Sequence, residues 1–243
     1  MGKGVWIWKL GQCEGGNVAA VIAKAQRAGL TRVLVKVADG LNPYNDTTKL
    51  HALADGLHAA GIDCWGWGWS YGGSASQAAA EANVAGHRVV GLGLHGYVLD
   101  AEVQYEQSGS AAWATAYCDR IRQVLETRPL GLTSYWSPVL HPEIPWRAFA
   151  QHVDYWWPQV YWYNRNPSTV LKASMAELAA YGKEVIPLGA ADPGDGCNSG
   201  LELGAFGLAV NANLALHHGA DFYQWSDIPG ANWTIIRDWV PRT

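Results

Sequence analysis

The sequence predicts a single (β/α)8 TIM barrel that spans residues 1–243, and three observations support this fold class. A chain of 243 residues is long enough for one such barrel. A short β-rich segment, a turn and an amphipathic helical segment follow one another eight times, roughly every 30 residues, which is the length of one βα unit. No hairpin signal or linker interrupts this series. An open doubly wound sheet is the alternative, since only the count of eight strands argues for closure.

Eight β-rich segments are the expected strands of this barrel. Val, Ile, Trp and Tyr dominate several of them, as is typical of strands. The expected strands are residues 5–9, 33–38, 64–69, 96–100, 131–135, 153–161, 184–189 and 221–225.

Apolar residues at helical spacing separate these strands. They recur at i, i+3, i+4 and i+7, which predicts one buried helix face in each unit. The clearest sets are Val18/Val21/Ile22/Ala25, Leu50/Leu53/Leu57/Ala60, Trp113/Tyr117/Ile121/Leu125 and Leu171/Met175/Leu178. Glycines such as Gly61 end several of these segments, as left-handed caps do. The fifth unit is the weakest, because residues 143–150 predict only a short helix.

Composition and charge exclude several classes of protein. The 17 basic and 21 acidic residues give a net charge of −4 without basic runs, so we expect no nucleic-acid partner. The sequence contains no apolar run of about 18 residues, which is the length that a membrane span requires. His and Cys spacings match no metal-site motif, so we expect neither metal nor cofactor. We interpret Cys13, Cys64, Cys118 and Cys197 as buried free thiols, with a disulfide as the alternative.

The end of the fourth expected strand carries the sharpest chemical signal. Asp100 and Glu102 follow the apolar run Tyr97-Val-Leu and lie on one face, because side chains alternate along a strand. Active sites of these barrels lie at the C-terminal strand ends. Mutual repulsion and partial burial would raise the pKa of one carboxyl above that of the other. An acid beside a carboxylate is what glycosidic bond cleavage requires. Two solvated carboxylates at a loop edge are the alternative.

Aromatic residues suggest a second feature of the site. The chain holds 14 Trp and 11 Tyr but only 3 Phe, and Trp and Tyr combine a flat face with a polar edge that suits sugar rings. Tyr135, Tyr161, Tyr163 and Trp225 lie at strand ends and are candidate sugar-binding residues. Trp65, Trp67 and Trp69 alternate with glycine, and we interpret them as packing outside the barrel beneath the helices.

Three phrases resemble the barrel lysozymes of glycoside hydrolase family 25, the muramidases of bacteria and phage endolysins. They are residues 33–40 (VLVKVADG), 97–102 (YVLDAE) and 222–225 (FYQW). The resemblance implies that Glu102 is the general acid/base. Asp100 would be the partner carboxylate that stabilises the transition state or orients a substrate acetamido group. It also implies a substrate cleft lined by Lys36 and Asp39. Gln159 and Tyr161 resemble cleft residues of the sixth strand in related barrel glycosidases, including the chitinase-like group. Gln224, at the end of the eighth expected strand, is a further candidate substrate-binding residue.

One departure from that family keeps a second function open. The first expected strand ends in Trp8-Lys9, where the family usually has an Asp. A barrel that binds carbohydrate without cleaving it, or a phage structural module, is therefore the alternative to a hydrolase of a peptidoglycan-like cell-wall polysaccharide. A barrel enzyme that uses Lys36 as a base or Schiff-base former ranks third.

The chain's N-terminus bears on where the protein acts. Residues 1–10 lack the apolar segment of a secretory signal, so we expect synthesis in the cytoplasm, with release by lysis or attachment to a virion. We expect a monomer that has no membrane partner.

Overall fold

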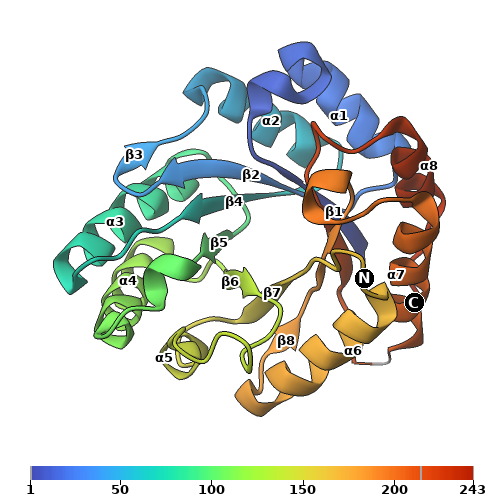
Figure 1. Ribbon diagram of the computed structural model, residues 1–243. Coiled ribbons are helices and arrows are strands. Elements are labelled where there is room, and N and C mark those ends of the chain that lie inside the picture. The colour runs from blue at the N-terminus through green and yellow to red at the C-terminus, as the bar shows by residue number, and fades with distance from the viewer. Residues whose placement is uncertain (1, 214, 243) are drawn as a thin grey trace.

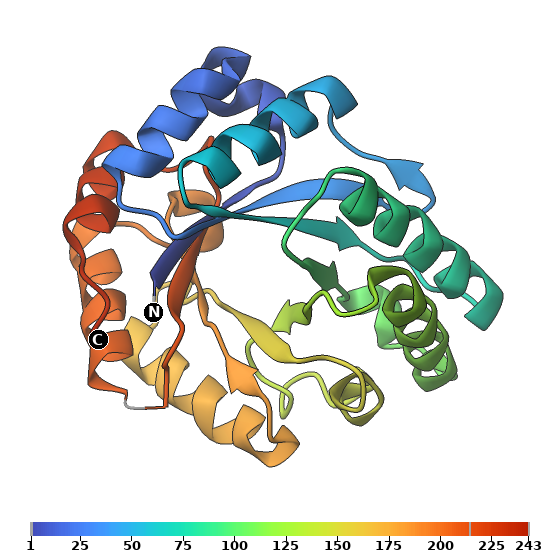
Figure 2. The same ribbon diagram turned by 180° about the vertical axis from the view of Figure 1, so that it is seen from behind.

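The computed structural model describes residues 2–213 and 215–242, and these form a closed barrel of parallel strands inside a ring of helices (Figure 1). The barrel strands are β1 (Gly2–Ile7), β2 (Arg32–Asp39), β4 (Asp63–Trp69), β5 (Tyr97–Asp100), β6 (Leu130–Tyr135), β7 (Tyr155–Val160), β8 (Glu184–Val185) with β9 (Leu188–Ala190), and β10 (Gly219–Tyr223). The helices are α1 (Val18–Arg27), α2 (Thr47–Ala59), α3 (Ala75–Gly91), α4 (Ser110–Leu125), α5 (Trp146–Ala150), α6 (Pro167–Leu178), α7 (Gly200–Ala212) and α8 (Gly230–Asp238). The view from behind shows the helices outside the sheet all the way round (Figure 2).

Closure of the sheet confirms the barrel and excludes the open alternative. The strands pair in the order β1-β10-β9-β7-β6-β5-β4-β2, and β1 also pairs with β2. All of these pairings are parallel. The C-terminal ends of the strands therefore meet at one end of the barrel, where the loops carry the candidate site residues.

The eight expected strands are all present, with two local differences. The seventh is split by Ile186 and Pro187 into β8 and β9, which pair with β7 at separate points. A two-residue strand, β3 (Asn42–Pro43), turns back antiparallel on the end of β2, a small hairpin that no sequence signal predicted. The helix of the fifth unit, α5, is as short as expected. Among the described residues, no helix is long and apolar enough to cross a membrane.

The main core lies between the barrel and its helices. It gathers outward-facing strand residues such as Val5 and Val35 and helix residues such as Leu53 and Ile121, all at most 1% exposed. The four cysteines are buried free thiols, which confirms the interpretation from their spacing.

A second apolar cluster fills the barrel interior and corrects the interpretation of the tryptophans on β4. Trp65 and Trp67 point into the barrel. Gly66 and Gly68 face outward instead: a Cβ on Gly66 would lie 3.0 Å from Val89 of α3. The interpretation that glycine lies inside and tryptophan outside is therefore wrong. Helix α3 lies close against β4, and glycine leaves it the space.

A buried ion pair lies in the barrel interior near the N-terminal strand ends. Arg32 Nε donates to Asp221 Oδ1 at 2.7 Å. The other carboxylate oxygen of Asp221 accepts from the indoles of Trp6 at 3.3 Å and Trp157 at 2.8 Å. We call these four residues the floor cluster. Because Asp221 is fully buried, its charge depends on these donors for compensation.

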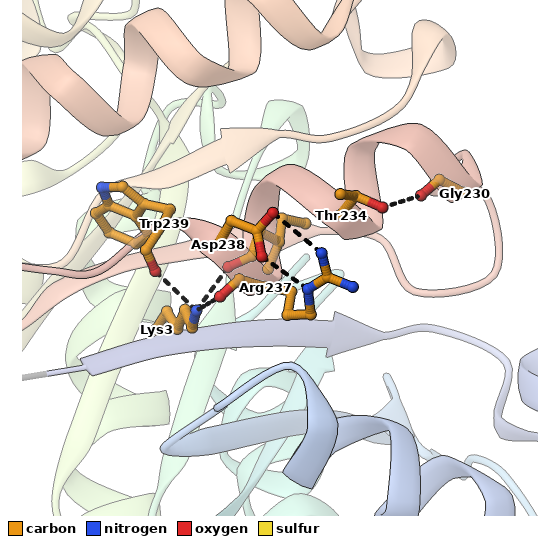
Figure 3. A network of polar contacts seen from close by, with 7 residues as sticks. Lys3, Gly230, Thr234, Arg237, Asp238 and Trp239 are labelled. Atoms are coloured by element: carbon orange, nitrogen blue, oxygen red, sulfur yellow. Dashed lines mark hydrogen bonds and ion pairs between the residues drawn. The ribbon is translucent and has the colours of Figure 1, made fainter.

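Lys3, on the outer side of β1, binds the C-terminal end of the last helix, α8. Lys3 Nζ donates to the carbonyls of Ile236, Arg237 and Trp239 at 2.6–2.7 Å, at the C-terminal end of α8 (Figure 3). These carbonyls have no partner within the helix, and a cation also suits the negative end of the helix dipole. Burial nevertheless lowers the pKa of Lys3 to about 8.

Candidate active site

A cavity of about 540 Å³ opens at the C-terminal end of the barrel. Its volume lies in the range of small-molecule and oligosaccharide sites. Aromatic rings and carboxyl groups dominate its walls. The lining residues include Trp6, Trp8, Lys36, Trp67, Trp69, Asp100, Glu102, Tyr135, Trp136, His141, Gln159, Tyr161, Tyr163, Arg165, Asp195 and Tyr223.

Asp100 and Glu102 meet inside this cavity, as the sequence predicted. Asp100 is the last residue of β5, and its side chain points into the barrel at 5% exposure. Glu102 follows in the loop. Gln159 of β7 donates from Nε2 to Glu102 Oε1 at 2.6 Å, and the same nitrogen lies 3.5 Å from Asp100 Oδ1. One amide thus holds both carboxyl groups in a single unit.

Burial favours the protonated form of both carboxyl groups in this pair. Loss of solvation raises the pKa of Asp100, and the neighbouring Glu102 raises it further. Burial also raises the pKa of Glu102, although Gln159, Asp100 and His141 oppose that rise. Two carboxyls that share one donor cannot both ionise at low cost. The unit therefore offers a proton donor and a carboxylate side by side, which suits acid/base chemistry.

Lys36 supplies a positive charge in the wall of this cavity. Its ammonium lies 3.5 Å from Asp39 Oδ2 and within 6 Å of the ring centroids of Trp8, Tyr44 and Trp67. Burial lowers the pKa of Lys36, and Asp39 and Asp100 partly restore it. The ammonium is thus an electrostatic partner for Asp100 held in an aromatic box.

Four aromatic side chains form a continuous part of the cavity wall. Trp6 lies 5.3 Å from Trp67 and 6.4 Å from Tyr223 between ring centroids, and Tyr223 lies 6.1 Å from Tyr161. The apolar faces and polar edges of such rings are complementary to a pyranose ring.

Seven of the ten residues predicted from the sequence line the cavity together. They are Lys36, Asp100, Glu102, Tyr135, Gln159, Tyr161 and Tyr163. Asp39 does not line it: its carboxylate lies against Lys36 and accepts from the Tyr71 hydroxyl at 3.0 Å.

The structure also corrects the placement of the two predicted residues of the eighth unit. Gln224 donates to Asp227 at 2.8 Å. Trp225 is 2% exposed, donates to Glu14 and stacks edge-on against Trp233 of α8. Neither side chain lines the cavity. Strand β10 ends at Tyr223, and beyond that point strand alternation no longer decides which way side chains point.

Several cavity residues were missed by the sequence analysis. Trp6, Trp67 and Tyr223 lie on strands, where the period of two could have found them once the inner face was known. His141, Arg165 and Asp195 come from loops, where no periodic signal exists. Burial and the neighbouring Asp192 raise the pKa of Asp195 to about 7. Within the described residues, no cluster of His, Cys, Asp and Glu could hold a metal ion.

The resemblance of this chain to known proteins lies in its fold. No family model matches this sequence, and no curated protein matches it either. Solved structures do resemble it. A family 18 chitinase from Cycas revoluta in complex with (GlcNAc)3 has a TM-score of 0.69 at 13% identity, covering 98% of this chain and 99% of that one.

Two further solved structures show the same likeness. An endo-β-N-acetylglucosaminidase from Cordyceps militaris gives a TM-score of 0.66 at 13% identity, covering 98% of this chain and 88% of that one. A family 113 β-1,4-mannanase gives 0.68 at 10% identity, covering 98% and 96%. At such low identity these structures support the barrel fold, which several glycosidase families share. They do not specifically support the resemblance to family 25 lysozymes.

Proposed function

We propose that this protein is a glycoside hydrolase that cleaves an N-acetylated cell-wall polysaccharide, with Glu102 as the general acid/base and Asp100 as its partner. The observation that carries the proposal is the buried Asp100–Glu102 pair, joined by Gln159 at the base of an aromatic cavity. A proton donor beside a carboxylate in a sugar-sized site is the arrangement that acid-catalysed glycoside cleavage needs. The resemblance of the fold to chitinases and a mannanase is consistent with it.

The geometry of the pair favours a substrate-assisted mechanism. Inverting enzymes place two carboxyls roughly 6.5–9.5 Å apart on opposite sides of the bond, and retaining enzymes roughly 5–5.5 Å apart across it. Asp100 and Glu102 instead leave the same strand end and share one amide nitrogen. They therefore approach a substrate from one side, and the nucleophile must come from elsewhere. The acetamido oxygen of an N-acetylated sugar can supply it.

The proposed steps follow from these positions. Asp100 passes the proton of the pair to Glu102 and becomes a carboxylate, and Glu102 gives that proton to the departing glycosidic oxygen while the acetamido oxygen attacks the anomeric carbon. The glycosidic C–O bond breaks, and a cyclic oxazolinium ion forms. Asp100 orients the acetamido N–H and stabilises its positive charge. Glu102, now a carboxylate, takes a proton from water as that water opens the ring, and the anomeric configuration is retained.

The substrate class follows from this chemistry. A sugar with an acetamido group must occupy the position beside Asp100, and both peptidoglycan and chitin provide one. Within this class we propose peptidoglycan as the natural substrate, reached after lysis of the producing cell. This part of the proposal rests on the short motifs of the sequence.

A panel of glycans tests the proposal. Wild type and the Glu102→Gln variant are incubated with peptidoglycan, chitin oligosaccharides, mannan and a de-N-acetylated chitosan oligosaccharide, and new reducing ends are counted. We expect cleavage of an N-acetylated member, with a loss of roughly 10²–10⁴-fold in Glu102→Gln. The chitosan oligosaccharide should not be cleaved. Glu143→Gln, an exposed acid outside the cavity, is the matched control.

Binding measurements separate this proposal from a barrel that only binds sugar. The first strand brings Trp6 and Trp8 to the cavity and no carboxylate, and this favours the second candidate. Retention of a glycan by wild type without any cleavage, unchanged in Glu102→Gln and weakened in Tyr161→Ala, would establish a non-catalytic carbohydrate-binding module. If wild type cleaved the chitosan oligosaccharide as fast as it cleaves the N-acetylated oligosaccharide, the acetamido mechanism would be ruled out.

A further inference from the structure

A histidine–carboxylate pair places its histidine in the wall of the cavity that Glu102 also lines. His141 comes from the loop after β6, and its Nδ1 lies 2.7 Å from Oε1 of Glu106 in the loop after β5. Both side chains are about two-thirds or more buried. No sequence pattern points to either residue, because each lies in a loop and they are 35 residues apart.

Contacts on several sides hold the imidazole in place. Its ring stacks on Tyr135, with centroids 3.6 Å apart and planes inclined by 11°. The backbone carbonyl of His141 accepts from the indole of Trp146 at 2.8 Å, which anchors the loop to α5. Because Glu106 accepts the proton on Nδ1, Nε2 is the nitrogen left to face the cavity that His141 and Glu102 both line.

We propose that the Glu106–His141 pair is a positioning device that keeps a positive charge beside Glu102 and so sets the pH range over which Glu102 can act as acid and then as base. The inference rests on the proposed function, since it assigns regulation to the same site. A carboxylate on Nδ1 stabilises the imidazolium, as it does in other acid/base pairs. His141 acts through Glu102 and need not touch the reacting bond.

The other charges around Glu102 make this role specific. The hydrogen bonds of Gln159 and Asp100 also lower the pKa of Glu102, but neither group brings a positive charge. Asp195 after β9 is a further acid in the same cavity, and Glu102 raises its pKa. Lys36 is engaged with Asp39 and Asp100. Arg165 lines the same cavity, with its guanidinium 5.8 Å from the ring of Trp136. His141 is the cation that lowers the pKa of Glu102.

The sign of the effect follows directly. A nearby imidazolium favours the ionised form of Glu102, so its removal raises the pKa of Glu102. Glu102 must be protonated to act as acid. The alkaline limb of the rate profile should therefore move to higher pH when His141 becomes neutral.

Titration of Glu102 by ¹³C NMR tests this without a substrate. In full-length protein labelled at glutamate side-chain carboxyls, the Glu102 signal is assigned by its loss in Glu102→Gln. We expect His141→Gln to raise the Glu102 midpoint by about half a pH unit or more, and His141→Lys, which keeps a cation, to leave it close to wild type. His95→Gln is the matched control, because His95 also contacts a carboxylate, Asp63, at 3.4 Å but at the opposite end of the barrel.

An unchanged Glu102 midpoint in His141→Gln would overturn the inference, and so would a His141→Lys midpoint equal to that of His141→Gln. A rate profile that only loses height in His141→Gln, without moving its alkaline limb, would also contradict it. Failure of the wild type to cleave any glycan would sink the proposed function alone, because the NMR titration is independent of turnover.

Discussion

The two ends of the barrel interior differ in the number of hydrogen-bond donors that their buried acids receive. In the floor cluster, Asp221 receives a guanidinium and two indole N–H groups. At the cavity end, Asp100 and Glu102 share one amide of Gln159. Both environments are apolar and rich in tryptophan. The number of donors per carboxyl group therefore decides the role: an acid with enough donors supports the fold, and acids short of donors retain a proton for chemistry.

The largest expected effect comes from removing the charge of Asp221 in the floor cluster. Asp221→Asn removes the negative charge that Arg32 faces, and a buried, unpaired guanidinium should lower the free energy of unfolding by about 3–5 kcal/mol. Urea denaturation of purified protein measures it. The mutation leaves the cavity residues in place, so a variant that stays folded should keep its glycan binding. An unchanged unfolding midpoint would show that the floor cluster is not a structural support.

A second variant removes the shared donor at the cavity end. Gln159→Leu keeps the size of the side chain but takes the hydrogen bond from Glu102, and hydrogen bonds to charged groups contribute about 1.5–3 kcal/mol. We expect kcat/KM to fall roughly 10–100-fold. The alkaline limb should move to higher pH, because Gln159 lowers the pKa of Glu102. A pH–rate profile identical in shape to that of wild type would argue that Gln159 binds substrate and does not tune the acid.

The smallest expected effect concerns the third cavity acid. Asp195 has a pKa of about 7 in the folded chain against a reference value of 3.8. Between these values the folded state holds a proton on Asp195 that the unfolded state releases. The contribution of Asp195 to stability is therefore fully present below about pH 4 and is lost as the pH rises through 7. Asp195→Asn should remove this decline and gain on the order of 1 kcal/mol at neutral pH, since the site is partly exposed to solvent.

Thermal unfolding of Asp195→Asn and wild type at about pH 4 and pH 8 measures the difference. The two proteins should unfold at similar temperatures in acid and diverge at the higher pH. Equal divergence at both pH values would mean that the substitution acts through packing and not through charge.

The sequence predicted the barrel well because its strands and helices have strong periodic signals. Each of the eight strand segments forms, and Asp100 and Glu102 lie where strand alternation put them. Alternation tells which residues share a face, but not which face is inside. That is why Trp67 was assigned to the wrong side of β4: the small size of Gly66 serves the approach of α3, a contact that cannot be read from the strand itself.

The loops limited what could be predicted of the site. His141 and Asp195 reach the cavity through turns whose direction depends on contacts far away in the chain, such as Glu106 with His141. At the eighth strand the error was one of extent: the strand stops at Tyr223, so Tyr223 faces the cavity while Trp225 packs against α8. A periodic pattern gives no warning of where a strand stops.

The contact of Lys3 with α8 has a consequence for the order of assembly during synthesis. Strand β1 can pair early with β2, but its second parallel neighbour lies at residues 219–222, and Lys3 donates to the carbonyls of Ile236, Arg237 and Trp239. Until residues 219–222 leave the ribosome, one edge of β1 is unpaired, and until Trp239 leaves it, the Lys3 ammonium lacks one of these acceptors. The barrel therefore closes only after β10 has emerged, and the contact of Lys3 with α8 is completed later still.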